Sequence, residues 1–225
     1  MKHLIVGGSK GIGADLVRQF IAKGEECIVF SRTEMEYFAG VDHFQLDVTT
    51  DELPELEDLK SITYCPGSIN LKPFSSLKEE DFLADFSINV LGAVRVVKKY
   101  HRQLKANNGS IVLFSTVAVS QGMPFHASVA VSKAGVEGLT RSLAAELAPH
   151  VRVNCIAPTI TDTPLAAGLL RSDKIRENTA ERHPLKRFLE PKEIAGMAAY
   201  LHGEFSIGIS GQVIGIDAGL SRLRV

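Results

Sequence analysis

Short apolar segments alternate with longer amphipathic segments from one end of the chain to the other, and this alternation restricts the possible folds more than any other feature. The segments that we predict to be strands are His3–Gly7, Cys27–Ser31, His43–Leu46, Ile62–Cys65, Ile111–Ser115, Arg152–Ile156 and Gln212–Ile216. Most are continuous apolar runs, which is typical of strands buried on both faces. Strands that alternate with helices predict an α/β fold with a parallel sheet, whose ligands bind beyond the carboxyl ends of the strands.

Helices are predicted where apolar residues recur at steps of three and four. This spacing occurs in Leu16–Ile21, Phe82–Val97 and Val136–Leu147. The sequence has no internal repeat, low-complexity tract or Pro/Gly/Ser-rich linker. We therefore expect the 225 residues to form a single domain.

The charge balance argues against nucleic acid or an anionic membrane as the main partner. The chain has 25 Lys+Arg against 26 Asp+Glu, and such partners select a basic excess. A small-molecule substrate is the remaining expectation. Cys27, Cys65 and Cys155 form no C-x-x-C motif, and the apolar start is too short for a signal peptide, so we expect a cytoplasmic protein. No motif supports a metal site.

A glycine-rich loop joins the first predicted strand to the first predicted helix. It reads Gly7-Gly8-Ser9-Lys10-Gly11-Ile12-Gly13. In this context Gly7 permits a tight turn, Gly11 lets backbone amides approach a pyrophosphate, and Gly13 lets the helix pack closely. The spacing predicts a dinucleotide site that includes Ser9, Lys10 and Ile12; the alternative is a turn that only connects strand and helix.

The end of the second predicted strand indicates which dinucleotide binds. An acidic residue there would bind the ribose 2′-hydroxyl of NAD, but this chain has Ser31 and Arg32. With Lys10 they offer a hydroxyl and two cations to a 2′-phosphate, so NADP(H) is preferred and NAD(H) remains possible. The alternative is that Lys10 and Arg32 are ordinary solvated cations.

Asp47 and Val48 follow the third predicted strand. Asp47 could accept a hydrogen bond from the adenine amino group. It could equally cap the turn into Thr49 and Thr50. Both interpretations stay open on the sequence alone.

Several further motifs, in order along the chain, resemble the short-chain dehydrogenase/reductase family. They are the glycine loop, Asn89 in Ser87–Gly92, Lys133 in Ser132–Gly135, Val153–Pro158 followed by Thr163, and Ser210–Gly219. The resemblance covers nearly the whole chain. It implies a Rossmann-like, doubly wound sheet of seven parallel strands in the order 3-2-1-4-5-6-7, assembled as a homodimer or homotetramer.

The same resemblance implies hydride transfer between a nicotinamide and a carbonyl or alcohol. It places Asn89, Thr116 and Lys133 among the catalytic residues, with Lys133 also on the cofactor. It places Gly67, Pro158 and Thr163 against the cofactor as well. The variable segment around residues 160–185 would form a lid, and it leaves the substrate unidentified.

The sequence departs from the family at the proton donor. The family has a tyrosine four residues before its lysine, and this chain has Val129 there. Because a positioned acid contributes typically ~10²–10⁴-fold, its loss predicts weak or atypical turnover. The alternative is a catalytically silent cofactor-binding sensor, partner subunit or scaffold.

Few other side chains could supply the proton. His126 lies three residues before Val129 and titrates in a suitable range, although a lone loop histidine is usually not catalytic. Tyr64 is expected on the adenosine side of the cofactor. The remaining tyrosines are Tyr37, Tyr100 and Tyr200, all remote in the order of elements. Water is the other candidate donor.

Overall fold

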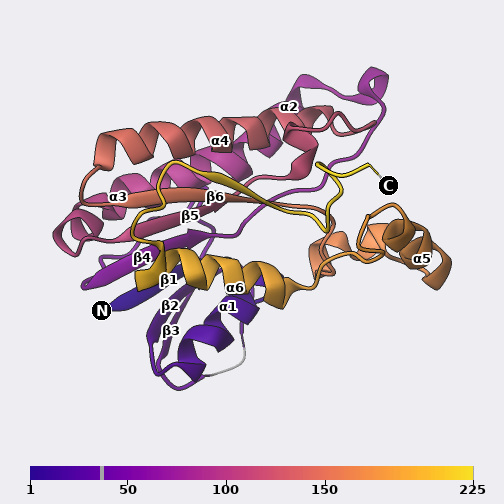
Figure 1. The fold of residues 1–225 in the computed structure, drawn as a ribbon. Helices are drawn as coiled ribbons and strands as arrows, with labels where there is room; N and C mark the ends of the chain where they lie inside the picture. Colours follow the sequence, from indigo (N-terminus) through magenta and orange to yellow (C-terminus); the bar gives the residue numbers. More distant parts are fainter. Residues whose placement is uncertain (36–37, 225) are drawn as a thin grey trace.

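A computed structural model describes residues 1–35 and 38–224 of the protein. The fold is built on one parallel sheet. Seven strands lie in the order β3-β2-β1-β4-β5-β6-β7, as predicted (Figure 1). Their bounds are β1 (Lys2–Val6), β2 (Glu26–Ser31), β3 (Val41–Gln45), β4 (Leu59–Tyr64), β5 (Ser110–Phe114), β6 (Arg152–Pro158) and β7 (Val213–Ile216). Each predicted strand is confirmed to within a few residues. Tyr37 lies outside the described residues.

Helices connect the strands and cover both faces of the sheet. The longer ones are α1 (Gly11–Ala22), α2 (Glu79–Phe86), α3 (Gly92–Ala106), α4 (Ala127–Leu147), α5 (Asp173–Glu181) and α6 (Pro191–His202). The helix predicted over Phe82–Val97 is interrupted, because a π-helical turn over Ser87–Leu91 joins α2 to α3. Such a turn accommodates one extra residue and is frequent at functional sites.

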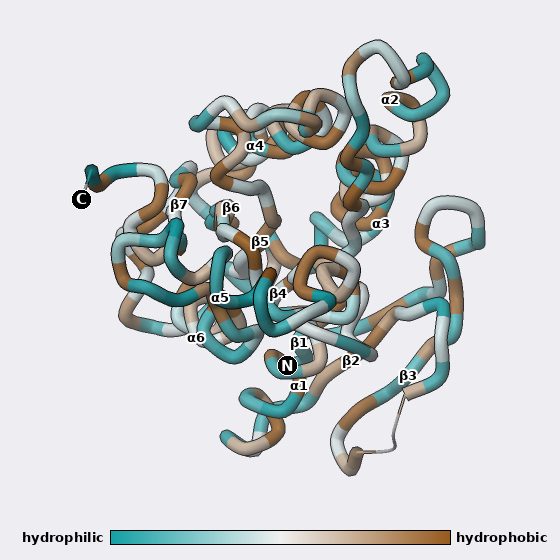
Figure 2. Tube along the Cα trace, turned by 90° about the vertical axis from the view of Figure 1, so that its right-hand side faces the viewer, coloured by the Kyte–Doolittle hydropathy of each residue, from teal (hydrophilic) through white to brown (hydrophobic). Residues whose placement is uncertain are grey.

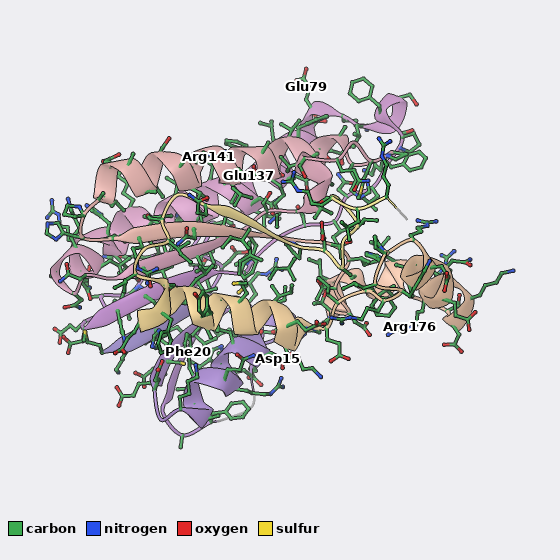
Figure 3. The ribbon with its side chains drawn as sticks, viewed as in Figure 1. Asp15, Phe20, Glu79, Glu137, Arg141 and Arg176 are labelled. Carbon is green, nitrogen blue, oxygen red and sulfur yellow. The ribbon has the colours of Figure 1, made fainter. Side chains whose placement is uncertain are left out.

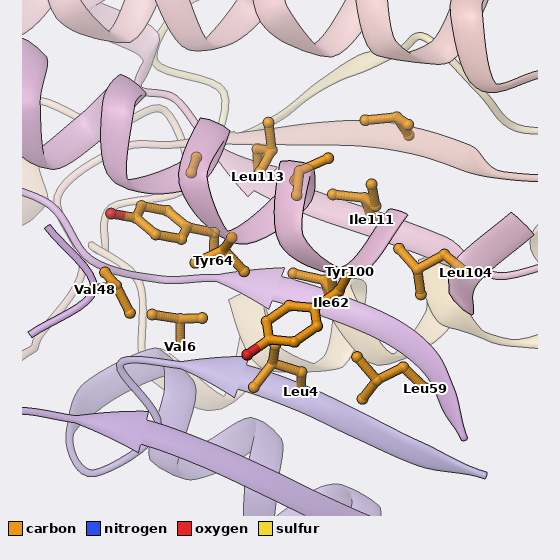
Figure 4. Packing of buried hydrophobic residues seen from close by; sticks show 14 of the residues in the cluster. Leu4, Val6, Val48, Leu59, Ile62, Tyr64, Tyr100, Leu104, Ile111 and Leu113 are labelled. Carbon is orange, nitrogen blue, oxygen red and sulfur yellow. The ribbon is translucent and has the colours of Figure 1, made fainter. Parts of the chain in front are cut away.

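Two apolar layers hold the helices to the sheet. On one face, α3 and α4 pack over strand residues that include Leu4, Ile62 and Ile111 (Figures 1 and 4). On the other face, α1 and α6 pack over Ile5 and Val112. Figure 2 shows the hydrophobic segments gathered along the central strands. Burial on both faces explains why these strands are continuous apolar runs.

Within the described part of the chain, no helix is both long enough and apolar enough to cross a membrane.

Candidate cofactor-binding and active site

The glycine loop adopts the conformation that its sequence predicts. Gly7 has φ +79° and Gly11 has φ +56°, values that disfavour residues with a Cβ atom. A Cβ atom at Gly13 would overlap the carbonyl oxygen of Gly7 and lie 2.9 Å from its carbonyl carbon. Gly13 therefore allows α1 to begin directly against the turn. These three roles match the requirements of a dinucleotide loop.

The N-terminus of α1 is left open for an anion. Lys10 occupies the N-cap position, and among the described residues no side chain forms a capping hydrogen bond there. The first backbone amides of a helix have no partner within it, so those of Gly11, Ile12 and Gly13 can donate to a phosphate at the positive end of the helix dipole.

The residues after β2 differ in part from the prediction. The Ser31 hydroxyl is buried, donates to the carbonyl oxygen of Thr33 and pairs with Nε2 of His43 across 2.8 Å. It therefore stabilises the turn, and no free hydroxyl of Ser31 faces a phosphate. Thr33, which the sequence analysis did not single out, places its own hydroxyl 3.2 Å from that of Ser9. These two hydroxyls link the glycine loop to the end of β2.

Arg32 and Lys10 remain exposed beside this hydroxyl pair. Neither forms an ion pair with a carboxylate in residues 1–35 or 38–224. The positive charge of Arg32 helps to lower the pKa of Asp47, after the larger contribution of hydrogen bonds from Thr49. Two cations thus lie at the edge of the sheet where a 2′-phosphate was predicted.

Asp47 caps the turn that follows β3. Its Oδ1 accepts hydrogen bonds from the amide and the hydroxyl of Thr49 at 2.9 and 2.6 Å. Val48 is buried, and its carbonyl oxygen accepts a hydrogen bond from Arg95. The structure therefore shows the turn-capping interpretation of Asp47, while the adenine contact stays a prediction.

Asn89 lies in the π-helical turn and is buried, with 1% of its surface exposed. Its Nδ2 atom contacts Oγ of Ser132 at 3.0 Å, Oγ of Ser68 at 3.1 Å and the carbonyl oxygen of Asp85 at 2.9 Å. Its Oδ1 atom has no partner among the described residues. Asn89 therefore faces the interior, toward α4, and not the solvent.

Lys133 projects from α4 into the same region and is 8% exposed. Its ammonium group donates to the carbonyl oxygen of Phe114, at the end of β5, across 2.8 Å. A Cβ atom at Gly67 would lie 3.3 Å from both Nζ of Lys133 and Oδ1 of Asn89, so the two groups meet across this glycine. Burial lowers the pKa of Lys133 to about 8. A buried lysine with a lowered pKa is typical of a functional site.

Val129 lies one helical turn before Lys133 and is also buried. Its carbonyl oxygen accepts a hydrogen bond from Ser132, and its side chain has no group that could carry a proton. Thr116 follows β5, two residues after the carbonyl group that binds Lys133, and remains partly exposed. Its Oγ1 accepts a 3.3 Å hydrogen bond from the amide of Ala118, which leaves the hydroxyl proton free to donate.

The segment after β6 reaches the glycine loop. β6 ends at Pro158, and a Cβ atom at Gly11 would lie 3.3 Å from Cγ2 of Thr163. The Thr163 hydroxyl caps the 3-10 helix over Pro164–Leu169. Farther along, Arg176 of α5 pairs with Asp162 and lies over the ring of Phe188, 4.9 Å from its centroid (Figure 3). These contacts hold the segment predicted as a lid beside the cofactor loop.

The other candidate proton donors are engaged elsewhere. The hydroxyl groups of Tyr64, Tyr100 and Tyr200 donate to the main-chain oxygens of Ile88, Pro54 and Phe205. Nδ1 of His126, at the start of α4, pairs with the carbonyl oxygen of Pro124 at 2.7 Å, so only its Nε2 could face a substrate.

Asp85 and Ser68 also belong to this site, although they were not predicted from the sequence. Asp85 is a buried carboxylate on α2, and its Oδ1 accepts a 2.5 Å hydrogen bond from Ser68. The spacing in the sequence could have indicated Asp85, because residues four positions apart lie on the same side of a helix and Asp85 lies four positions before Asn89.

The sequence also matches known proteins over almost its full length. Residues 6–221 match the family described as "Enoyl-(Acyl carrier protein) reductase". The 3-oxoacyl-[acyl-carrier-protein] reductase FabG of Thermotoga maritima is 34% identical over 240 residues, covering 96% of each chain. The chain belongs to the short-chain dehydrogenase/reductase family. It is therefore an oxidoreductase of the short-chain dehydrogenase/reductase type.

This chain is also similar to other proteins over nearly its full length. A tropinone reductase homolog of Arabidopsis thaliana is 30% identical over 97% of this chain and 90% of its own. A solved short-chain dehydrogenase family protein of Francisella tularensis superposes with a TM-score of 0.91 at 23% identity, covering 99% of both chains. That structure shows the common fold of the short-chain dehydrogenases.

Proposed function

We propose that this short-chain dehydrogenase/reductase binds NADP(H) and transfers hydride to or from a small carbonyl or alcohol substrate, with slow proton transfer. The proposal depends mainly on one observation: Val129 and Lys133 share a buried side of α4. Lys133 is the family's lysine, and Val129 stands where the family has its tyrosine. The chain would thus keep the apparatus that binds the cofactor and lack the usual proton donor.

The residues of the glycine loop fit a dinucleotide. Uncapped amides at the start of α1 and the close approach permitted by Gly11 suit the pyrophosphate. Lys133 would hold the nicotinamide ribose, with Gly67 leaving room beside it. Pro158 and Thr163 would border the nicotinamide. When bound, the cofactor supplies or accepts the hydride, and the protein positions the two reactants.

The preference for NADP(H) is supported by charge. Arg32 and Lys10 can meet a 2′-phosphate with charge-assisted hydrogen bonds, and the member of the Thr33–Ser9 pair that accepts from the other can donate its own hydroxyl proton. Structures of ElxO, which share this fold at TM-scores of 0.84 and 0.85, are described with NADP and with NADPH bound. One of them is a tyrosine-to-phenylalanine variant with NADPH, so in ElxO a lost phenol is compatible with cofactor binding.

In the reaction, Thr116 would donate a hydrogen bond to the substrate oxygen and polarise it. Lys133 would orient the ribose, and Asn89 would hold Ser132 and the π-helical turn in place. The proton would come from water or from Nε2 of His126, because Val129 offers none. Relatives described as 3-oxoacyl-[acyl-carrier-protein] and carbonyl reductases support a carbonyl as the substrate class.

A second candidate function is a cofactor-binding protein without turnover, which serves as a sensor, partner subunit or scaffold. The same residue, Val129, favours it. The two candidates differ in one respect, since only the first consumes NADPH when a carbonyl compound is present.

We also propose a homodimer or homotetramer built on the face of α3 and α4. A largely apolar groove runs between these helices, lined by Val94, Val97, Lys98, His101, Leu139, Leu143, Glu146 and Leu147. A second copy could cover this groove by two-fold symmetry, the commonest closed arrangement. The free cysteines Cys27, Cys65 and Cys155 support a cytoplasmic location.

Titration of the protein with NADPH and NADH, followed by nicotinamide fluorescence, tests the proposed function. We expect tighter binding of NADPH and slow NADPH oxidation with a panel of ketones, aldehydes and quinones. Equal affinities would contradict the cofactor preference. Turnover at ordinary enzyme rates, ~1–10³ per second, would contradict slow proton transfer, and binding with no turnover at all would favour the second function.

A further inference from the structure

Asp85 is a buried carboxylate close to the candidate active site. It lies on α2 with 2% of its surface exposed, and Oδ1 accepts a 2.5 Å hydrogen bond from the hydroxyl of Ser68. Its Oδ2 atom has no hydrogen-bond partner among the described residues. Burial of a carboxylate is unfavourable without a compensating charge, so a nearby cation is expected.

Ser68 and Asn89 connect this carboxylate to α4. Asn89 Nδ2 contacts the Ser68 hydroxyl, which donates onward to Asp85, and it also contacts the main-chain oxygen of Asp85 and the hydroxyl of Ser132. Ser132 immediately precedes Lys133. Asp85 therefore supports the turn and helix that position Asn89 and Lys133.

Lys133 is the cation that faces this network. Its Nζ and Oδ1 of Asn89 would each lie 3.3 Å from a Cβ atom at Gly67, the residue next to Ser68. Nζ donates to a neutral carbonyl group, that of Phe114. In residues 1–35 and 38–224, no carboxylate oxygen lies within 4.0 Å of Nζ. Lys133 therefore has no direct ion-pair partner in the described part of the chain.

The other acidic groups around Lys133 are uncharged near neutral pH or are already paired. Cys65, after β4, and Cys155, on β6, act on Lys133 when ionised, but burial raises the pKa of each thiol to about 12. Both are uncharged near neutral pH. Glu137, on α4, accepts a hydrogen bond from Ser115 and pairs with Arg141 (Figure 3). Asp85 is the remaining carboxylate whose charge opposes the effect of burial on the Lys133 pKa.

We infer that Asp85 is a positioning residue that provides the counter-charge of Lys133 and, through Ser68 and Asn89, holds the lysine in place for the cofactor. This inference rests on the proposed function of Lys133 as the ligand of the nicotinamide ribose. Near neutral pH the ammonium form would persist in a buried site because Asp85 compensates its charge. Without Asp85, the same lysine would lose its proton more easily and would meet the ribose hydroxyls as a neutral amine.

Titration of Lys133 in the full chain without cofactor tests the counter-charge directly. Lysine labelled with carbon-13 at Cε reports the protonation of each side chain by NMR, and the Lys133→Met variant identifies the signal of Lys133. In the wild type we expect Lys133 to stay charged at neutral pH. In Asp85→Asn, which keeps the shape of the side chain, we expect the midpoint to fall by about one pH unit, a tenfold change in the protonation equilibrium.

The matched control is Glu79→Gln, because Glu79 is an exposed carboxylate on the same helix and points away from the site (Figure 3). It should leave the Lys133 midpoint unchanged. If Asp85→Asn fails to fold, Asp85→Leu replaces it, since an apolar residue of similar volume is often tolerated in place of a buried charge. The inference is overturned if the Asp85 variant titrates like the wild type, or if wild-type Lys133 is already neutral at neutral pH.

A second arm separates this inference from the proposed function. NADPH affinity is measured against pH for the wild type and Asp85→Asn. If the inference and the proposed function both hold, NADPH affinity falls as the pH rises through the midpoint of Lys133. In Asp85→Asn this fall occurs at a lower pH than in the wild type. A shifted Lys133 midpoint with unchanged NADPH affinity would confirm the counter-charge and contradict the role of Lys133 on the cofactor.

Discussion

Val129 and Lys133 lie one helical turn apart on α4, and both side chains are buried, with 6% and 8% of their surfaces exposed. Residues four positions apart share one side of a helix, so a group at position 129 lies on the same side of α4 as Lys133. This pair provides a direct test of the proposed mechanism.

Val129→Tyr is expected to increase carbonyl reduction by ~10²–10⁴-fold, the contribution of a positioned general acid. The charge of Lys133 would stabilise a phenolate at this position and lower the tyrosine pKa toward the working range. Steady-state oxidation of NADPH with the panel of carbonyl compounds measures the effect.

Val131→Tyr is the matched control, because Val131 is on the same helix and 58% exposed. It should leave the rate unchanged. Since a larger ring in a buried position can disturb packing, NADPH affinity is measured in both variants. An unchanged rate in Val129→Tyr, with cofactor affinity intact, would show that the missing phenol is not what limits turnover.

Arg32→Ala is expected to weaken NADPH binding by about ten- to a hundredfold and to leave NADH binding nearly unchanged. Only NADPH carries the phosphate that Arg32 would bind, and a hydrogen bond to a charged group contributes ~1.5–3 kcal/mol. Fluorescence titration measures both affinities. Arg102→Ala, which removes an exposed arginine from α3, is the control. Parallel losses for the two cofactors would place Arg32 away from the phosphate.

Gly13→Ala is expected to destabilise the fold by ~1–3 kcal/mol or more, because the added methyl group would overlap the glycine turn. Gly138→Ala adds the same methyl group within α4, where no described atom outside the backbone of the helix itself lies within 4 Å of it. There we expect a gain of up to about 1 kcal/mol, because alanine is the better helix former. Urea unfolding of both variants compares the two positions, and equal effects would mean that close packing of α1 is unimportant.

The protein should lose stability as the pH falls, because His202 is buried in its neutral form. Its ring nitrogens pair with the hydroxyls of Thr63 and Ser110, and burial, then the charges of His3 and Arg152, hold its pKa well below the usual value. The unfolded chain binds this proton below about pH 6.5 and the folded chain does not, so acid favours unfolding by about 1.4 kcal/mol per pH unit per histidine.

In His202→Gln, one proton fewer should be taken up on unfolding in acid, so the free energy of unfolding should depend less steeply on pH. Any loss of stability that does not depend on pH comes in addition. His150→Gln, at an exposed histidine, should leave the slope as it is. Chemical denaturation at a series of pH values measures the slope. A variant as acid-sensitive as the wild type would mean that other groups cause the pH dependence.

If the proposed homo-oligomer forms, Leu139→Glu is expected to convert it to monomers, because it places a charge in the groove between α3 and α4. Ala145→Glu adds the same charge at an exposed position of α4 outside the residues that line the groove. Light scattering at micromolar concentration gives the mass of each. A monomeric wild type would contradict the proposed assembly, and an oligomeric Leu139→Glu would place the interface elsewhere.

The positions of all seven strands could be predicted from the sequence, because most of them are short apolar runs whose burial depends on their own composition. The glycine loop could be predicted for a similar reason. Gly7, Gly11 and Gly13 are required by local backbone geometry and close packing, and these requirements are visible within a few residues. Asn89 and Lys133 were found through family motifs, and the structure brings them together across Gly67.

Other features were decided only by tertiary structure. The hydroxyl of Ser31 is engaged within the protein because it donates to the carbonyl oxygen of Thr33 and pairs with Nε2 of His43, on the neighbouring strand β3. Asp85 meets Ser68 because the chain after β4 packs against α2. A sequence pattern records which residues prefer burial, but the direction of a polar side chain depends on partners distant in the chain. Those partners come within hydrogen-bond distance only when helices and sheet pack together.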